Sequence, residues 1–377
     1  LQHDLIAVGA WTVARQQVGG VDLSVAFAPG QERLAARLAA DLSRIVAREL
    51  ELFGSRPHPR YLLLFGRPDQ PGGFYGSPKR GSMTLSVAAD LPADSVAEGL
   101  CHLVAHEYHH TWMQASCQPH GELRFFIEGF TDWYAYRVTA ELGLLAPAGL
   151  RQAFLARLSA AESALSGYDD SLAAAGGADF FRGGPAYEAC YAAGLCLAVL
   201  LERGLPRAGG SSGLDALMQD FYGDPRWRDG TQPRLADWLE LLAERLGPEQ
   251  AGLHAAIESA LVSKAEIDWA ALFALTGLRL ERRIEALEQS PRANFKGTTV
   301  TALDPAGAAA AVGLAAGDRV LAVQGRAVAD EAALRRAWAA DPEGRFELRF
   351  ERDGKAQGYS GPYPSRAAWR CEPAEPW

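Results

Sequence analysis

The opening part of the chain combines short apolar runs with one long amphipathic segment. Residues 21–29 and 61–66 are apolar runs typical of buried strands, and residues 32–54 between them carry apolar side chains at helical spacing. A further run of strand-forming residues, 82–89, follows the turn-rich stretch 68–81. The pattern therefore predicts an α/β unit in which a long helix connects strands of one sheet.

Helical spacing dominates the middle of the chain. A further helix is predicted to begin after a cap at Asp94 or Ser95, and nearly every segment between 125 and 280 has apolar side chains at helical spacing. The longest apolar run, 189–201, is shorter than the roughly 20 residues that span a bilayer. We therefore expect a mostly helical region with a buried central helix and no transmembrane segment.

The character of the sequence changes near residue 290. Short runs of strand-forming residues follow, with one helical segment at 330–341. A hairpin is predicted over 345–359, turning at Asp353–Gly354, a dipeptide that favours two-residue hairpin turns. The sequence therefore predicts a small β-rich domain after residue 290.

Composition narrows the class of protein. A chain of 377 residues is long enough for two or three domains. Its net charge of -9 argues against nucleic acid as a partner, because phosphate binding usually requires a positive surface.

Five cysteines are too sparse for a disulfide scaffold, although a bond between Cys117 and Cys371 is compatible with the sequence. The chain begins at Leu1 without a basic or apolar leader, which leaves the compartment open.

Residues 106–110 read His-Glu-Tyr-His-His and fit the pattern H-E-x-x-H. They lie in the second half of the predicted helix that follows the cap at Asp94 or Ser95. On a helix this pattern places the imidazoles of His106 and His110 on one face, about 6 Å apart, where both can bind one Zn²⁺. The carboxylate of Glu107 can then act as general base toward a water molecule at the metal. Chance alone would produce the pattern in about one such chain in a hundred, so the site needs a third ligand.

Glu128 is the candidate for the third ligand, at the start of the next predicted helix. Asp132 follows one turn later on the same face, where its carboxylate can accept the free N–H of a zinc-bound imidazole and fix the tautomer. His120 and Glu122 lie in the connecting segment. They are weaker candidates, because a helix holds a ligand more rigidly than a loop does.

Other pairings in the same helix satisfy the chemistry less well. His102 lies four residues before the first ligand, but the residue that follows it is Leu103, which cannot serve as a base. His109 is adjacent to the second ligand and lies on another helical face, so it is at most a neighbour of the metal. We expect His102 to be a packed or hydrogen-bonded histidine. A metzincin site is excluded, because Met113 and Ser116 stand where its glycine and third histidine are required.

Four segments occur in an order that is specific to one group of zinc enzymes. They are HEYHHTW at 106–112, EGFTDWY at 128–134, YAAGLCLAVLLE at 191–202 and AVGLAAGDRVLAVQGRAV at 311–328. In this order they resemble the glycyl aminopeptidase family of gluzincin metallopeptidases, whose members join a thermolysin-like catalytic domain to a PDZ domain. The resemblance implies one Zn²⁺ per chain and a peptide or protein as the substrate.

The resemblance also implies an oxyanion donor. In these enzymes a tyrosine of a Tyr-x-Lys-Gly segment hydrogen-bonds the oxyanion of the tetrahedral intermediate, and Tyr191 and Gly194 occupy these places here. Ala193 replaces the lysine. Tyr187, one turn earlier, is the alternative donor, and the structural alternative is that both tyrosines are core aromatic residues.

Tyr75 departs from the family pattern. Family aminopeptidases carry a Gly-Gly-x-Glu segment on a strand that lines the cleft, and its glutamate holds the free α-amino group of the substrate. Here the corresponding residues are Gly72, Gly73, Phe74 and Tyr75. A neutral phenol cannot neutralise an ammonium group, so the anchor for a free amine is lost. Gly72 and Gly73 still allow a substrate backbone to approach the strand.

The expected fold class is α+β, with a thermolysin-like zinc peptidase domain followed by a small PDZ-like domain. We place the boundaries at 1–20 for a remnant of an N-terminal β region, 21–115 and 116–288 for the α/β and helical parts of the catalytic domain, 289–366 for the PDZ-like domain and 367–377 for a tail. A PDZ domain binds a peptide by adding a strand, but the carboxylate-binding loop is shortened here to 290–297. A peptide ligand at this domain is therefore an open expectation.

The expected function is zinc-dependent hydrolysis of peptide bonds, by an aminopeptidase or an endopeptidase, with Glu107 as general base and Tyr191 as oxyanion donor. The changes at Tyr75 and Ala193 favour one alternative from another class. It is a peptide-binding or scaffold protein that keeps the zinc peptidase fold with weak turnover or none.

Overall fold

The computed structural model describes residues 9–66, 74–87, 93–207, 212–264, 266–286, 291–304, 307–339, 345–362 and 365–372. The chain divides into two compact units, Leu1–Leu280 with Cys371–Trp377 and Glu281–Arg370. The second unit begins at Glu281 rather than at residue 289, where the sequence pattern places the boundary.

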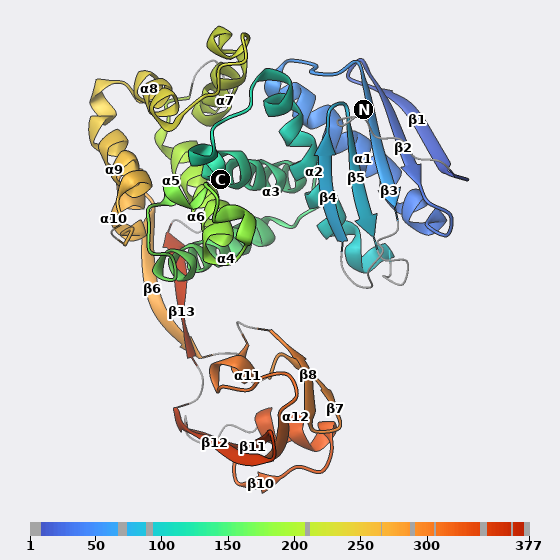
Figure 1. Ribbon diagram of the computed structural model, residues 1–377, viewed down its shortest axis with the longest axis vertical. Coiled ribbons are helices and arrows are strands. Elements are labelled where there is room, and N and C mark those ends of the chain that lie inside the picture. Colours follow the sequence, from blue (N-terminus) through green and yellow to red (C-terminus); the bar gives the residue numbers. More distant parts are fainter. Residues whose placement is uncertain are drawn as a thin grey trace. The chain divides into compact units, whose positions relative to one another are not determined.

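A five-stranded mixed sheet forms the first part of the first unit, in the order β1-β2-β3-β5-β4 (Figure 1). Its strands are β1 Thr12–Val18, β2 Val21–Phe27, β3 Arg60–Gly66, β4 Phe74–Lys79 and β5 Ser82–Val87. β2, β3 and β5 run parallel to one another, and β1 and β4 pair antiparallel at the two edges. The three apolar runs near the N-terminus therefore occupy the interior of the sheet, as the sequence predicts.

The expectation that residues 1–20 are a remnant of a separate N-terminal β region is wrong for residues 12–18, which form β1. Residues 12–18 pair along their whole length with β2 and are the first strand of the sheet. All of them except Val18 are exposed or half-exposed. An edge strand of this kind lacks the apolar alternation that marks a buried strand, so the pattern does not reveal it.

Two long helices connect the sheet to the rest of the unit. α1 (Glu32–Phe53) lies between β2 and β3 in the sequence and buries one face, including Leu38, Leu42 and Ile45. It ends at Gly54, whose left-handed conformation (φ 60) is typical of a helix C-terminus. α2 (Ala93–Ser116) contacts α1, β4 and α3, so the helix that carries the H-E-x-x-H pattern joins the sheet to the helical part.

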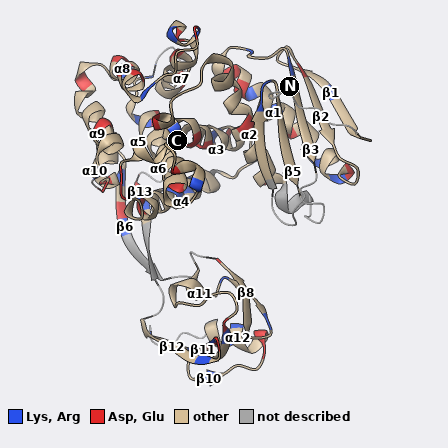
Figure 2. Ribbon diagram, in the orientation of Figure 1, with Lys and Arg blue, Asp and Glu red and all other residues tan. Residues whose placement is uncertain are grey.

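The remainder of the first unit is helical. Its elements are η1 Gly121–Leu123, η2 Phe125–Phe130, α3 Thr131–Glu141, α4 Pro147–Ser166, α5 Leu172–Ala175, η3 Phe180–Arg182, α6 Pro185–Gly204, α7 Gly213–Gly223, η4 Pro225–Trp227, α8 Leu235–Leu246, η5 Pro248–Gln250, α9 Ala251–Val262 and α10 Trp269–Ala274. Figure 2 shows acidic and basic residues on most of these helices.

α6 is the apolar helix that the sequence predicts. Within the described part of the chain it is the one helix whose length and composition would allow it to cross a bilayer, and 72% of its apolar window is buried inside the protein. Its residues 192–201 are all buried. α6 is therefore the core helix of the helical part.

The second unit contains a sheet in the order β12-β11-β9-β8-β7, with β10 paired to β9. Its elements are β7 Ala293–Lys296, β8 Thr299–Leu303, α11 Ala308–Ala311, β9 Arg319–Val323, β10 Arg326–Ala327, α12 Glu331–Ala339, β11 Arg345–Arg352 and β12 Lys355–Pro362. Trp338 of α12 is fully buried in the core of this unit. The predicted hairpin is confirmed, because Asp353 (φ 52) and Gly354 (φ 73) form the two-residue turn between β11 and β12.

β6 (Arg279–Ala286) and β13 (Ser365–Glu372) form a separate two-stranded sheet. The prediction of a tail over 367–377 is wrong for residues 367–372, which belong to β13, and residues 373–377 lie outside the described part. Apolar residues occupy the alternate positions 367, 369 and 371, but the run is short and lies between Pro364 and Pro373, so it resembles a loop in sequence. All five cysteines are buried free thiols, so no disulfide joins Cys117 to Cys371.

Candidate metal centre

His106, His110 and Glu128 bring three ligand atoms together from two segments. The Nε2 atoms of His106 and His110 are 3.2 Å apart, and Oε2 of Glu128 lies 3.6 Å from each. All three side chains are buried. Around a tetrahedral ion with bonds of about 2.0–2.1 Å, neighbouring ligand atoms lie about 3.3–3.4 Å apart. The three donors therefore fit a zinc ion with one coordination position left open.

Glu128 is positioned by an unusual helix and by a pair of glycines. It lies in the π-helix η2, a geometry that is rare and frequent at functional sites. A Cβ on Gly129 would lie 2.4 Å from backbone atoms of Gly194, and a Cβ on Gly194 would lie 2.1 Å from the carbonyl oxygen of Phe125. Only glycine at both positions allows α6 to approach η2 this closely. The approach also places Tyr191, one turn before Gly194, at the metal centre.

The carboxylate of Asp132 is shared between histidines. Its Oδ1 lies 2.9 Å from Nε2 of His102 and 3.7 Å from Nδ1 of His106. Its Oδ2 lies 2.9 Å from Nη2 of Arg157. Asp132 therefore lies beside His106, but its hydrogen bond of 2.9 Å is to His102, which is a hydrogen-bonded histidine as the sequence predicts.

The charges of the centre favour a cation. Burial alone would lower the pKa of His106, but hydrogen bonds to Asp132 and Glu128 and the charge of Glu107 raise it to about 10. Burial would raise the pKa of Glu128, but hydrogen bonds to the two ligand imidazoles hold it well below its ordinary value. Without a metal, a proton on an imidazole supplies the positive charge that these carboxylates require. A zinc ion can replace that proton.

Glu107 lies under the edge strand β4. Its side chain is buried, and its Oε2 has no hydrogen-bond partner among the residues that the structure describes. A Cβ on Gly76 of β4 would lie 2.5 Å from Cγ and 2.6 Å from Oε1 of Glu107. Gly76 therefore makes room for the carboxylate, a role that the sequence analysis missed although this glycine directly follows Tyr75. Burial raises the pKa of Glu107 above its ordinary value, which suits a group that must accept and release a proton.

The structure describes two of the four predicted substrate-binding residues, and both lie in β4. Gly72 and Gly73 lie outside the described residues. Phe74 begins β4, and Tyr75 pairs with Ser86 of β5. The side chain of Tyr75 is 60% exposed. The turn-rich stretch 68–81 therefore contains an edge strand, and Tyr75 presents a phenol to solvent.

Tyr191 is the tyrosine nearest to the ligands. Its ring stacks on that of His106, with centroids 5.9 Å apart and an interplanar angle of 17°. Burial and the charge of Glu128 raise its pKa, so the phenol keeps its proton and can donate a hydrogen bond. Tyr187 contacts Tyr191 at 4.7 Å between centroids and is 40% exposed. Of the two candidate donors, Tyr191 is therefore the one in contact with a ligand.

The remaining candidates lie away from the three ligand atoms. His109 is fully buried, with Nδ1 3.2 Å from Oε2 of Glu49 and Nε2 3.1 Å from the hydroxyl of Tyr222. His120 and Glu122 contact each other at 3.4 Å, and Glu122 accepts a hydrogen bond from a backbone N–H of α8. None of these three belongs to the ligand cluster of the described residues.

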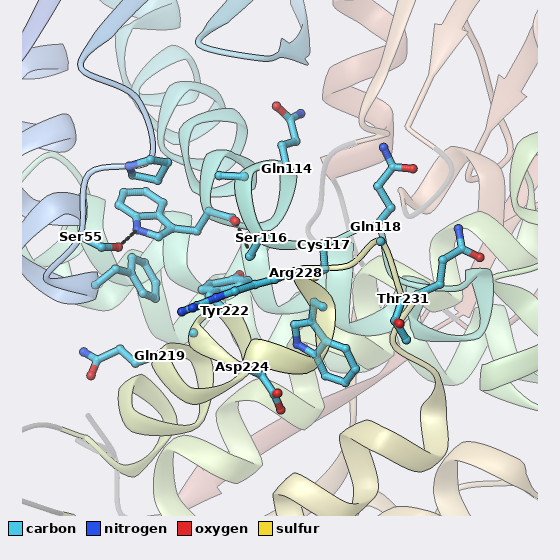
Figure 3. Close-up of a pocket in the computed structure, with 18 of the residues that line it drawn as sticks. Ser55, Gln114, Ser116, Cys117, Gln118, Gln219, Tyr222, Asp224, Arg228 and Thr231 are labelled. Carbon is cyan, nitrogen blue, oxygen red and sulfur yellow. Dashed lines mark hydrogen bonds between the residues drawn. The ribbon is translucent and has the colours of Figure 1, made fainter.

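A cavity of about 830 Å³ lies at the C-terminal end of α2. Figure 3 shows residues that line this cavity, with Ser116, Cys117, Tyr222 and Arg228 near the centre of the view and Ser55 at the left. No predicted site residue lines it. The cavity is therefore separate from the metal centre, although the hydroxyl of Tyr222 reaches His109.

Comparisons with known proteins agree with this architecture. A family model described as "PDZ domain" matches residues 299–352. No curated protein matches the sequence. A crystal structure of an aminopeptidase N family protein from Idiomarina loihiensis superposes with a TM-score of 0.67 at 19% identity, over 98% of this chain and 68% of that chain.

Two further crystal structures are less similar to this chain. They are variants of a two-domain M1 zinc metallopeptidase bound to L-tryptophan and to L-arginine, with TM-scores of 0.49 and 0.48 and identities of 15% and 16%. Each covers 68% of this chain, and this chain covers 52% and 53% of theirs. The predicted α+β fold class is confirmed by the match to the Idiomarina loihiensis structure together with the PDZ match: a fold similar to that of this aminopeptidase N family protein includes a C-terminal segment that matches a PDZ domain.

Proposed function

We propose that the chain is a zinc-dependent peptidase of the gluzincin type, similar to the glycyl aminopeptidase family, with His106, His110 and Glu128 as zinc ligands. The observation that carries this proposal is the triangle of donor atoms, with sides of 3.2, 3.6 and 3.6 Å, beside the buried carboxylate of Glu107. A bound zinc ion supplies Lewis acidity, which polarises a carbonyl group and makes a water molecule more acidic.

Glu107 is the general base of the proposed reaction. It accepts a proton from the attacking water through its free carboxylate oxygen, and it then donates this proton to the leaving amine as the peptide C–N bond breaks. Gly76 lies against this carboxylate, so β4 and α2 together determine the position of the Glu107 side chain.

Tyr191 and Asp132 support the reaction from two sides. The protonated phenol of Tyr191 donates a hydrogen bond to the oxyanion that develops on the carbonyl group. Asp132 faces the ligand His106 and holds its ring orientation, in a carboxylate anchored by Arg157. The substrate backbone is proposed to lie along β4, next to Tyr75.

The replacement of the amine anchor by Tyr75 predicts that a free N-terminus is not required. The test compares cleavage of a short peptide with cleavage of its N-acetylated form. We expect similar values of kcat/KM, because no carboxylate takes the place of the missing glutamate at Tyr75. Strict dependence on a free amine would contradict this assignment of Tyr75 and indicate an aminopeptidase.

The second candidate function is a peptide-binding protein with the same fold. It is favoured by Tyr75 and by Ala193, which replaces the lysine of the family pattern. Emission spectroscopy of the purified chain, combined with a screen of a mixed peptide library, distinguishes the two. One zinc per chain with cleavage supports the peptidase, whereas bound zinc without cleavage supports the binding protein.

A further inference from the structure

Exposed aromatic side chains lie near the metal centre. In the described part of the chain, the exposed large aromatic residues are Tyr75 (60%), Phe181 (76%) and Tyr187 (40%). Tyr75 precedes Gly76, which lies against Glu107. The other two belong to a set of contacting rings that leads to the ligand histidines. Exposed aromatic groups of this kind mark binding surfaces more often than scattered aliphatic ones do.

Four side chains form this set, which we call the aromatic row: Phe181, Phe180, Tyr187 and Tyr191. Consecutive ring centroids are 5.4, 5.0 and 4.7 Å apart. The last ring, that of Tyr191, stacks on the ligand His106. The row therefore runs from solvent to the metal centre without a break.

Arg124 provides a second connection from the row to the ligands. Its guanidinium lies 4.8 Å from the centroid of Phe180 and 5.3 Å from that of Phe181. Its Nη1 lies 3.4 Å from Oε1 of Glu128. Phe181 is therefore separated from a zinc ligand by one side chain only, and the cation beneath the two rings fixes their position.

The segment around η3 holds Phe181 out toward solvent. At its start, Gly176 and Gly121 are in direct backbone contact, since a Cβ on Gly176 would lie 2.0 Å from the carbonyl oxygen of Gly121. Phe180 is buried and anchors the segment, and Arg182 forms an ion pair with Asp179. The neighbouring Phe181 is thus presented by a fixed backbone, so a ligand can bury it at little cost in conformational entropy.

We infer that the aromatic row is a subsite for apolar, and preferentially aromatic, side chains of the substrate, and that Phe181 determines this specificity. The inference rests on the proposed peptidase function, of which it names the substrate class. The centroids of Phe180 and Tyr191 are also only 6.3 Å apart, so the ring of Phe181 lies at most about 12 Å from that of Tyr191. An extended peptide advances about 3.3 Å per residue, so the row reaches side chains up to about three residues from the cleaved bond.

The test uses peptides in which a single Phe is moved residue by residue along an otherwise Ser- and Ala-containing sequence. Mass spectrometry identifies the cleaved bond, and kcat/KM is measured for each peptide with the zinc-loaded full chain. We expect one Phe position, within about three residues of the cleaved bond, to raise kcat/KM over the peptide without Phe. Phe181→Ser is expected to lower kcat/KM for the peptide with Phe at this position by about five- to tenfold more than for the peptide without Phe.

Val262→Ser is the matched control, because Val262 is also exposed (53%) and lies on α9. It should change neither rate. Equal effects of Phe181→Ser on peptides with and without Phe, or no preference for Phe in the wild type, would overturn the inference.

A binding measurement separates this inference from the proposed function. The dissociation constant of each fluorescently labelled peptide is measured by anisotropy with the zinc-loaded Glu107→Gln chain, with and without Phe181→Ser. Weaker binding of the Phe peptide alone supports the subsite even if the wild type cleaves nothing. Binding that is independent of Phe181 contradicts the subsite even if cleavage is efficient.

Discussion

The absence of a side chain is required at several places around the metal centre. Gly76 leaves room for the carboxylate of Glu107, and Gly129 and Gly194 allow η2 and α6 to touch. At each position a Cβ would fall within 3 Å of another segment, closer than real Cβ contacts allow. The geometry of the candidate site therefore depends on these glycines as much as on the three proposed ligands.

Gly76→Ala tests this dependence on one residue. The new methyl group would lie 2.5 Å from Cγ of Glu107, and the carboxylate, at the end of a flexible side chain, must move away. Because a displaced base is costly, we expect kcat to fall by about tenfold or more, with zinc content and Tm nearly unchanged. Gly252→Ala on α9, where the methyl group meets nothing within 4 Å, is the control. Full activity of Gly76→Ala would show that β4 does not position the base.

The sequence predicts the local part of this site and misses the part made by distant segments. Helical spacing is sufficient to place His106, Glu107 and His110, because all three lie on one helix. The choice of His102 as the closest partner of Asp132 depends on how α2 and α3 pack. The contact of Gly76 with Glu107 likewise depends on the approach of β4 to α2, which no local pattern encodes.

At the scale of elements, the missed strands share one property. β1 and β4 are the two edge strands of the five-stranded sheet, and β13 pairs with a single strand, β6, so each has one unpaired edge among the described strands. Edge strands need no apolar alternation on their exposed parts, so they resemble loops in sequence. The elements β2, β3, α1 and α6 are predicted well, because their buried faces require apolar residues at regular spacing.

A buried ion network joins three helices behind the metal centre. Arg137 of α3 makes two hydrogen bonds of 2.7 and 2.9 Å to Asp215 of α7 and one of 3.1 Å to Glu202 of α6. Asp215 also accepts a hydrogen bond of 2.7 Å from the hydroxyl of Tyr134. The guanidinium therefore compensates two carboxylates that are largely withdrawn from water.

Arg137→Met is expected to destabilise the first unit by about 3–5 kcal/mol, because it leaves buried carboxylates without a counter-charge. Urea unfolding of the full chain measures this loss. Arg37→Met removes an exposed ion pair to Asp41 within α1 and should cost at most about 1 kcal/mol. A loss from Arg137→Met no larger than that of this control would show that the network contributes little.

In the whole molecule, each of the two units contains an ion pair with a buried aspartate, and that of the second unit joins Asp318 to Arg352. Asp318, buried in the turn before β9, accepts hydrogen bonds from Arg352 at 2.6 and 2.8 Å and from the backbone N–H of Ala315 at 2.7 Å. The guanidinium of Arg352 lowers the pKa of Asp318 below its ordinary value. The ion pair connects β11 to the turn at Gly317–Asp318.

This shift predicts an acid-dependent loss of stability. A carboxyl whose pKa is lower in the folded state stabilises the fold at pH values above its unfolded pKa, about 3.9 for Asp, and this contribution disappears as the pH falls through the folded pKa. Asp318→Asn should therefore lower the Tm of the second unit at pH 6 and lose less further stability than the wild type on acidification to pH 3. Calorimetry of the full chain at both pH values measures the difference. Parallel losses in wild type and variant would contradict the assignment.

The order of the two units could be predicted because each has a distinct pattern. Helical spacing ends before residue 290, and a hairpin signal at Asp353–Gly354 follows. The sequence could not locate the two-stranded sheet of β6 and β13, because its strands are far apart in the chain and pair across the boundary that the pattern suggests.

In the proposed mechanism, Glu107 performs base catalysis beside a zinc ion held by His106, His110 and Glu128. Its most direct test is the rate of peptide cleavage by wild type and by Glu107→Gln, both at one zinc per chain. Glutamine has nearly the same shape but cannot accept the proton, so we predict a rate lower by about 10²–10⁴-fold with zinc retained. Full activity of Glu107→Gln with bound zinc would contradict the mechanism.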